Sequence, residues 1–257
     1  MWRMKRVGAA AAVMLFAAST AAALNPSLDV SQYAHTSWTV RGGFSLGAVS
    51  TMAQTPDGYL WLGSEFGLFH FDGVSFVRWD PPDGAQLPAR HISKLLTARD
   101  GTLWIGTLAG LASWHDGRLT RVPELDKVMV TALLEDRHGT VWVGGRSEHG
   151  GHLCALQGGH GTCSGGDGVA GMFGRFVLRL HEDRAGTLWA GTDSGLWRWA
   201  PGAPKRYPIP GVQINDLSES DDGHLLIAIL NGGLKQLIHD RIEPYRIHTA
   251  SSPTAPL

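Results

Sequence analysis

The chain has 257 residues, of which 43% are hydrophobic, and a formal net charge of −1 at pH 7. This length and hydrophobic content suffice for one sizeable core. The near-neutral charge and the absence of charged runs give no electrostatic reason to expect binding to nucleic acid or to an anionic membrane. The 34 glycines exceed average usage, which suits a chain with many tight turns.

The first 23 residues have the pattern of a secretory signal peptide. Basic residues at positions 3, 5 and 6 precede an apolar stretch, and the small residues 21–23 offer a cleavage site. We expect residues 1–23 to direct export to the periplasm and to be removed. The alternative is a retained membrane anchor, because the apolar stretch reaches nearly 18 residues. Residues 24–44 form a lead-in segment in which Ser37–Val40 is typical of a strand.

From residue 45 to residue 245 one short phrase recurs five times at steps of 43, 38, 47 and 37 residues. Each copy has a turn glycine, and four copies have a tryptophan three residues later. A period of about 40 residues with strand-like content predicts an all-β fold, a β-propeller in which each repeat is one four-stranded blade. The structural residues of the repeat are Gly58, Gly101, Gly139, Gly186, Gly223, Trp61, Trp104, Trp142 and Trp189.

The second repeat shows how one copy becomes one blade. Its apolar runs Ile92–Ala98, Leu103–Ile105, Leu111–Trp114 and Leu119–Val122 are separated by glycine turns. We expect the repeated tryptophans to be buried between neighbouring blades, and the fifth blade to pack less well because Leu226 replaces the tryptophan.

Two cysteines, Cys154 and Cys163, flank a glycine-rich stretch of the third repeat. In an exported chain this count and spacing predict one local disulfide. The alternative is a metal site assisted by a neighbouring histidine, but the spacing matches no zinc pattern, so we expect no metal.

The third repeat also departs from the pattern after Gly144, where residues 145–154 replace the expected Thr-x-x-Gly-Leu. This is either a harmless surface excursion or a binding loop. The loops that follow the second strand of each blade vary between repeats and should gather on one rim of the ring. We expect a ligand to bind there. The candidate residues are Glu65, Phe66, Arg146, Glu148, His149, Asp193 and Asn231.

The number of blades leaves two arrangements open. The five repeats already complete the fifth blade near Tyr245, and the tail 246–257 builds no strand. Either five blades close with Trp38 over the seam, or the ring is partial and further blades lie beyond this chain. We favour the partial ring.

No set of residues predicts catalysis. The acids beside turn glycines and the recurring Asp136 and Asp183 are expected to bond the local backbone, because catalytic residues have no reason to recur once per blade. The twelve histidines show no metal-ligand spacing, and no cofactor motif is present. Trp114, Trp197 and Trp199 could stack on sugars, but core packing explains them as well.

The repeated phrase, clearest in Asp100–Leu111 and Asp57–Leu68, resembles the two-component regulator propeller repeat. The stretch Asp29–Arg41 also resembles the segment that precedes such propellers in bacterial sensor proteins. The resemblance implies a periplasmic input module, followed in such sensors by a β-sandwich, a membrane span and an output such as a histidine kinase. No kinase chemistry is assigned to these residues, and an output would lie in a C-terminal part outside them.

We therefore expect an exported propeller that senses an unknown small molecule or glycan and contacts downstream sensor domains or a second copy of itself. One alternative is a free-standing periplasmic propeller that binds protein or glycan. Another is a propeller glycosidase or lyase. The arginines do not form the cluster that such an enzyme needs for a carboxylate substrate, and the spacing of Asp and Gly in the turns differs from that of the Asp-box in sialidase propellers. Both observations disfavour an enzyme.

Overall fold

The computed structural model of the chain describes residues 46–158, 160–166, 171–209 and 213–246. The chain divides into two units, Met1–Phe44 and Ser45–Leu257, and all described residues belong to the second. The predicted signal peptide, the lead-in segment with Ser37–Val40, and the tail after residue 246 lie outside the described residues.

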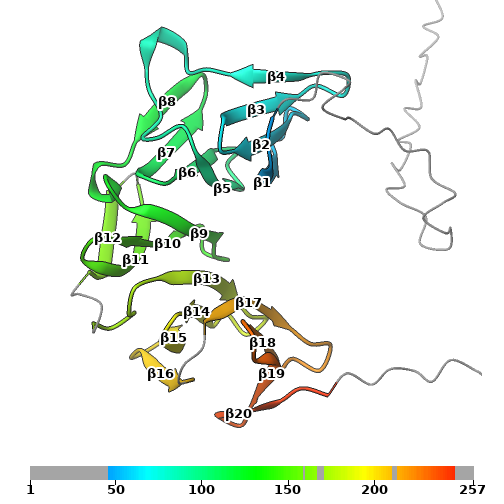
Figure 1. Ribbon diagram of the computed structural model, residues 1–257, viewed down its shortest axis with the longest axis vertical. Helices are drawn as coiled ribbons and strands as arrows, with labels where there is room; N and C mark the ends of the chain where they lie inside the picture. The colour runs from blue at the N-terminus through cyan, green and yellow to red at the C-terminus, as the bar shows by residue number, and fades with distance from the viewer. Residues whose placement is uncertain (1–45, 159, 167–170, 210–212, 247–257) are drawn as a thin grey trace, which may run out of the picture. The chain divides into compact units, whose positions relative to one another are not determined.

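The described residues form twenty strands in five antiparallel sheets of four strands, and every sheet takes its strands in chain order (Figure 1). Sheet by sheet, the strands are β1 Val49–Gln54, β2 Leu60–Ser64, β3 Gly67–Phe71 and β4 Phe76–Trp79; β5 Ile92–Thr97, β6 Leu103–Thr107, β7 Gly110–His115 and β8 Arg118–Arg121; β9 Met129–Glu135, β10 Val141–Ser147, β11 Gly150–Gln157 and β12 His160–Gly165; β13 Val177–Glu182, β14 Leu188–Thr192, β15 Gly195–Ala200 and β16 Lys205–Pro208; β17 Ile214–Glu219, β18 Leu225–Ile229, β19 Gly233–Ile238 and β20 Arg241–Pro244. Two short 3-10 turns, η3 Pro82–Gly84 and η4 Pro123–Leu125, precede the second and third sheets.

The sheets pack against one another in chain order through their first strands. Contacts join β1 to β5, β5 to β9, β9 to β13 and β13 to β17, as Figure 1 lets the reader follow. The all-β class and the four-stranded blades predicted from the repeat are thereby confirmed. Closure of these blades into a ring stays a prediction.

The first hairpin of each sheet turns at the repeated glycine. In each of these described turns the glycine N–H donates to the main-chain oxygen three residues earlier, as from Gly139 to Asp136 at 3.0 Å. The five glycines have φ between 82° and 92°, a region that residues with a side chain rarely adopt. The regular glycine spacing in the sequence is therefore a requirement of the turn.

An aspartate links this turn to the repeated tryptophan in the third and fourth sheets. Asp136 Oδ1 accepts hydrogen bonds from the N–H groups of His138 and Thr140, both at 2.9 Å, and Oδ2 accepts one from the Trp142 indole at 2.8 Å. Asp183 and Trp189 repeat the arrangement at 2.8 Å. Burial alone would raise the pKa of Asp136, but the hydrogen bonds outweigh it and hold this pKa below its ordinary value. These aspartates are architectural.

A β-branched side chain faces a glycine at each boundary between neighbouring sheets. A Cβ atom on Gly106 would lie 2.6 Å from Val130 Cγ1, closer than real Cβ contacts come. Val130 itself is completely buried. The four described pairs are Gly63 with Ile92, Gly106 with Val130, Gly144 with Val177, and Gly191 with Ile214. The glycine of the Trp-x-Gly phrase therefore leaves the space that a β-branched side chain of the next sheet fills.

The repeated tryptophans lie beside these contacts. Trp61 and Trp189 are 4% and 6% exposed, whereas Trp104 and Trp142 are half-buried at their boundaries. Trp61 packs in one cluster with Ile92 and residues of β6 from the next sheet.

Arginines and glutamates also connect neighbouring sheets at the first-hairpin turns. Arg137 Nε lies 2.6 Å from Glu182 Oε1, and the same guanidinium donates to the main-chain oxygen of Asp183 at 2.7 Å. Arg99 pairs with Glu135, and Arg184 pairs with Glu219, each at 4.0 Å. These pairs fasten the second sheet to the third, the third to the fourth and the fourth to the fifth.

Candidate functional site

The predicted ligand face lies at the turns between the second and third strands of each sheet. Neighbouring sheets pack in the same orientation, so these turns follow one edge of the stack, here named the turn edge. Its described turns are residues 65–66, 108–109, 148–149, 193–194 and 230–232.

A hydroxyl group stiffens most turns of the turn edge. Thr107 Oγ1 donates to the main-chain oxygen of Gly110 at 2.8 Å and accepts the Ala109 N–H at 3.2 Å. Ser64 and Thr192 make the same two contacts in their own sheets. The turn edge is therefore a rigid platform on which only the turn side chains vary.

Not all of the predicted ligand residues are available on this platform. The carboxylate of Asp193 accepts the Arg175 N–H at 2.9 Å and the Phe176 N–H at 3.3 Å, and it lies 3.0 Å from Arg175 Nε. Its side chain is only 12% exposed. Asp193 therefore holds the segment that enters β13, and its role in ligand binding stays a prediction.

The other predicted ligand residues are exposed but belong to different sheets. Glu65 and Phe66 form the turn of the first sheet, and Asn231 lies in the turn of the fifth. Arg146, Glu148 and His149 come together in the third sheet. The structure thus concentrates chemically diverse side chains on one hairpin of the turn edge.

The irregular third repeat is an extended hairpin. Strands β10 and β11 add the pairs Arg146 with Gly151 and Ser147 with Gly150 before turning at Glu148 and His149. In this hairpin Ser147 Oγ lies 2.7 Å from His152 Nε2, while still accepting the His149 N–H at 3.0 Å. The sequence irregularity is therefore an ordered projection of the sheet.

Two cavities adjoin this hairpin. The larger has a volume of about 510 Å³ and includes Lys127, Glu148, His149 and His152 in its lining. The smaller, of about 160 Å³, is lined by Arg146, Ser147, Glu148, Gly150 and Arg175. Ser147 and Glu148 line both, so the two cavities share a wall.

The acidic groups around these cavities have partners. Glu148 lies 3.4 Å from His149 Nε2, and Glu124 lies 3.7 Å from His160 Nδ1. The pKa of Glu124 is held below its ordinary value by hydrogen bonds from main-chain N–H groups and by the nearby His160. Asp126 pairs with Arg121 at 2.7 Å.

Cys154 and Cys163 are joined by a disulfide, with their Cα atoms 4.0 Å apart. They face each other directly across β11 and β12, so the bond ties the outer strand to the sheet that carries the extended hairpin. Within the part of the chain that the structure describes, no group of three or more histidine, cysteine, aspartate or glutamate side chains is placed to hold a metal ion.

The three tryptophans that could stack on sugars contact other aromatic rings. Trp114 packs edge-on against Trp79 with centroids 5.0 Å apart. Trp197 and Trp199 lie 5.5 and 5.3 Å from the ring of the fully buried Phe173. Core packing therefore accounts for their positions.

Sequence reasoning missed three residues near the extended hairpin: Lys127, Arg175 and Phe176. Arg175 and Phe176 precede β13, and Lys127 follows η4, so all three come from connections between sheets. The only sequence signal is that Lys127 and Arg175 are basic residues in the connections before and after the third repeat. Folding brings Arg175 to the cavity that Arg146 lines, and Lys127 to the neighbouring larger cavity.

Comparison with known proteins supports the repeat. Residues 43–66 and 124–147 match the family model described as two component regulator propeller. No curated protein matches the chain significantly. Among the described residues, no helix has the length and apolar character needed to cross a membrane.

Solved structures share the fold. The extracellular domain of the hybrid two-component system BT3049 from B. thetaiotaomicron is 19% identical, with a TM-score of 0.64 over 81% of this chain and 31% of that one. The corresponding domain of BT4673 is 22% identical, with a TM-score of 0.59 over 72% of this chain and 26% of that one. This chain therefore spans less than a third of those two domains.

Virginiamycin B lyase from Staphylococcus aureus has a TM-score of 0.61 over 80% of this chain and 72% of its own, at 12% identity. At these identities the likenesses establish the propeller fold and no activity. The family match is confined to residues 43–66 and 124–147, which resemble repeats of the two component regulator propeller.

Proposed function

We propose that this protein is a periplasmic ligand-sensing propeller, the input module of a two-component signalling system. The observation that carries the proposal is the in-register repeat, which matches the two-component regulator propeller model at residues 43–66 and 124–147. Two structural neighbours are extracellular domains of hybrid two-component systems, which supports the same role.

The protein acts by binding. The recurring acids of the described turns are committed to turns and tryptophans, as Asp136 is to Trp142. The variable side chains gather on the turn edge, and the extended β10–β11 hairpin offers the ligand two cavities. A ligand can shift a signalling equilibrium only if it binds two states of the assembly with different affinity. The boundaries between sheets, fastened by buried contacts, transmit that difference to the downstream part of the sensor.

Export is tested by expressing the full chain in a Gram-negative host and separating the periplasmic fraction. The mature protein is expected there, with a mass that lacks residues 1–23. Retention in the cytoplasm at full mass would contradict the proposal.

Signalling is tested by deleting the coding sequence in the source bacterium and comparing transcripts across a panel of carbon sources. We expect one condition in which a transcriptional response depends on the gene and is restored by complementation. If no condition shows such a response and the purified protein hydrolyses a glycan panel, the enzyme interpretation replaces the sensor. If the response is absent and no hydrolysis occurs, the free-standing binder replaces it.

A further inference from the structure

Two arginines converge on one aromatic ring beside the smaller cavity of the extended hairpin. The guanidinium carbons of Arg146 and Arg175 lie 4.8 and 5.7 Å from the centroid of the Phe176 ring. Both arginines line the cavity of about 160 Å³. Contact with the ring restrains the planar guanidinium groups, so little freedom is lost when they bind a ligand.

Within the described part of the chain, the cation of Arg146 at this cavity has no ion-pair partner of its own, although Glu148 also lines the cavity. Among the residues that the structure describes, the guanidinium of Arg146 has no carboxylate within 4.0 Å, nor has the ammonium group of Lys127. The Nε of Arg175 is engaged by Asp193 at 3.0 Å, and Glu148 lies beside His149. A cation held next to a second cation, without an acidic partner of its own, favours an incoming anion.

This arrangement occurs at the place where one repeat departs from the others. The turns of the first, second and fourth sheets close directly after a serine or threonine hydroxyl. The third sheet inserts Arg146 with its partner Gly151 before the same turn. Features that recur in every sheet are explained by the fold. Arg146 occurs only in the extended hairpin of the third sheet, so the shared fold does not explain its presence.

We propose that Arg146 and Arg175 form a binding site for a small organic monocarboxylate. The guanidinium forks bind the carboxylate in the smaller cavity, and the rest of the ligand extends past Ser147 and Glu148 into the larger cavity, near Lys127. Glu148 lines both cavities, so its own charge disfavours dianions such as inorganic phosphate. This inference rests on the proposed function, because it names the ligand class of the turn edge.

The test uses D-glucuronate, its uncharged counterpart D-glucose, and inorganic phosphate in calorimetric titrations of the protein purified after export. Glucuronate is expected to bind, more weakly at higher salt, and glucose and phosphate to bind at least tenfold more weakly. Arg146→Ala should weaken glucuronate binding by about tenfold or more, the loss expected for a charged hydrogen-bonded contact. Glu148→Gln should strengthen it by removing the competing charge.

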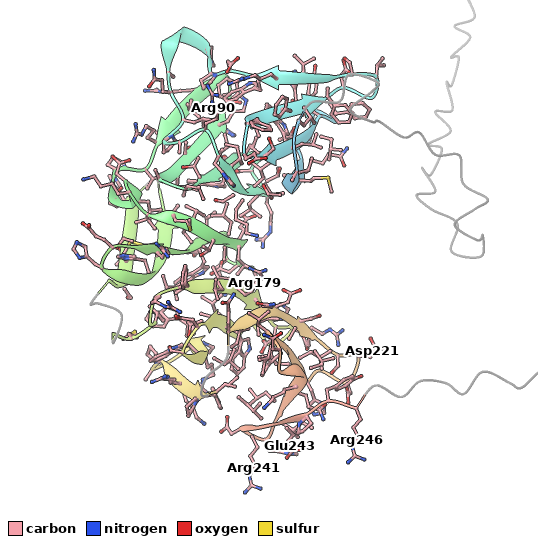
Figure 2. The ribbon with its side chains drawn as sticks, viewed as in Figure 1. Arg90, Arg179, Asp221, Arg241, Glu243 and Arg246 are labelled. Carbon is pink, nitrogen blue, oxygen red and sulfur yellow. A yellow bond between two sulfur atoms is a disulfide. The ribbon has the colours of Figure 1, made fainter. Side chains whose placement is uncertain are left out.

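Arg241→Ala is the matched control. Arg241 is an exposed arginine of β20, and Figure 2 shows it at the edge of the fifth sheet, pointing away from the strands. Its removal should leave binding unchanged. The melting temperature of the Arg241 variant should equal that of the wild type, and that of the Arg146 variant should fall by no more than about 4 °C, the loss expected for one exposed cation–π contact. Equal affinity of the two arginine variants would overturn the site, as would glucose binding as tightly as glucuronate, or no glucuronate binding up to 20 mM.

The two proposals fail separately. If a transcriptional response depends on the gene but glucuronate does not bind, the ligand class is wrong and the sensor role stands. If the protein remains in the cytoplasm, the sensor role is wrong whatever the titrations show.

Discussion

Replacing Gly106 by alanine should destabilise the boundary between the second and third sheets. The new methyl group would lie 2.6 Å from Val130 Cγ1 and 2.9 Å from Val130 Cβ. Val130 is fully buried and its β-branched side chain is stiff, so it cannot move aside without disturbing its own sheet. Overpacking of this kind costs about 1–3 kcal/mol. For a protein of this size, that corresponds to a fall in melting temperature of roughly 2–12 °C.

A second substitution tests whether this contact is the cause. Val130→Ala alone should cost about 2–3 kcal/mol, because it removes two buried methyl groups and leaves a void. In the double variant the alanine at position 106 fills part of that void. The double variant should therefore be more stable than the sum of the two single effects implies, by about 1–2 kcal/mol.

Thermal unfolding followed by circular dichroism measures all three variants. Ala228→Gly is the control, because Ala228 occupies the equivalent position in the fifth sheet, and no further sheet follows it among the described residues. Its effect should stay within the backbone cost of a glycine in a strand, about 0.5–1 kcal/mol. Strict additivity of the two substitutions, or a neutral Gly106→Ala, would refute the idea that the glycine is a hole for the next sheet.

Three further effects follow from the turns and boundaries. Asp136→Ala should lower the melting temperature at pH 7, since the half-buried Trp142 indole loses its acceptor, at a cost of about 1 kcal/mol. The folded-state pKa of Asp136 lies below its ordinary value of 3.8. The contribution of Asp136 to the free energy of unfolding is therefore present above that pH and is lost as the pH falls through the folded-state pKa. Asp136→Asn should accordingly make the melting temperature fall less steeply below about pH 4. Arg137→Ala should cost about 1 kcal/mol by breaking contacts to the fourth sheet, whereas Arg118→Ala, an exposed arginine with no ion pair among the described residues, should be neutral in the same assay.

The sequence was sufficient to predict the sheets because each repeat contains the residues that mark its own turns. Glycines with positive φ and apolar runs are local signals, and the four strands of the second repeat follow them closely. The role of Gly106 was not predictable in this way. Its backbone is not in the left-handed region, and the reason for it is Val130, 24 residues later in another sheet.

Long-range partners also explain what was missed at the candidate site. The sequence makes Asp193 a candidate ligand residue by its place in a turn, but its hydrogen-bond donors are Arg175 and Phe176, 18 and 17 residues earlier. Arg175 in turn lies beside Arg146 only because β10 and β13 belong to neighbouring packed sheets. A repeat pattern in the sequence shows only what the blades have in common. Contacts that an irregular repeat makes with its neighbouring sheet can therefore be found only in the folded structure.

The same reasoning applies to the two outer faces of the stack. Val49 occupies the position of Ile92 and Val130 in the first sheet, yet it is 36% exposed while they are fully buried. The fifth sheet presents Leu226 and Ala228 where the other sheets present a tryptophan and a glycine. The methyl group of Ala228 occupies the space that the glycines of the other sheets leave for a β-branched side chain of the next sheet. A contact between Val49 and the fifth sheet would therefore have to be built differently from the four internal boundaries, because Ala228 stands where those boundaries have a glycine.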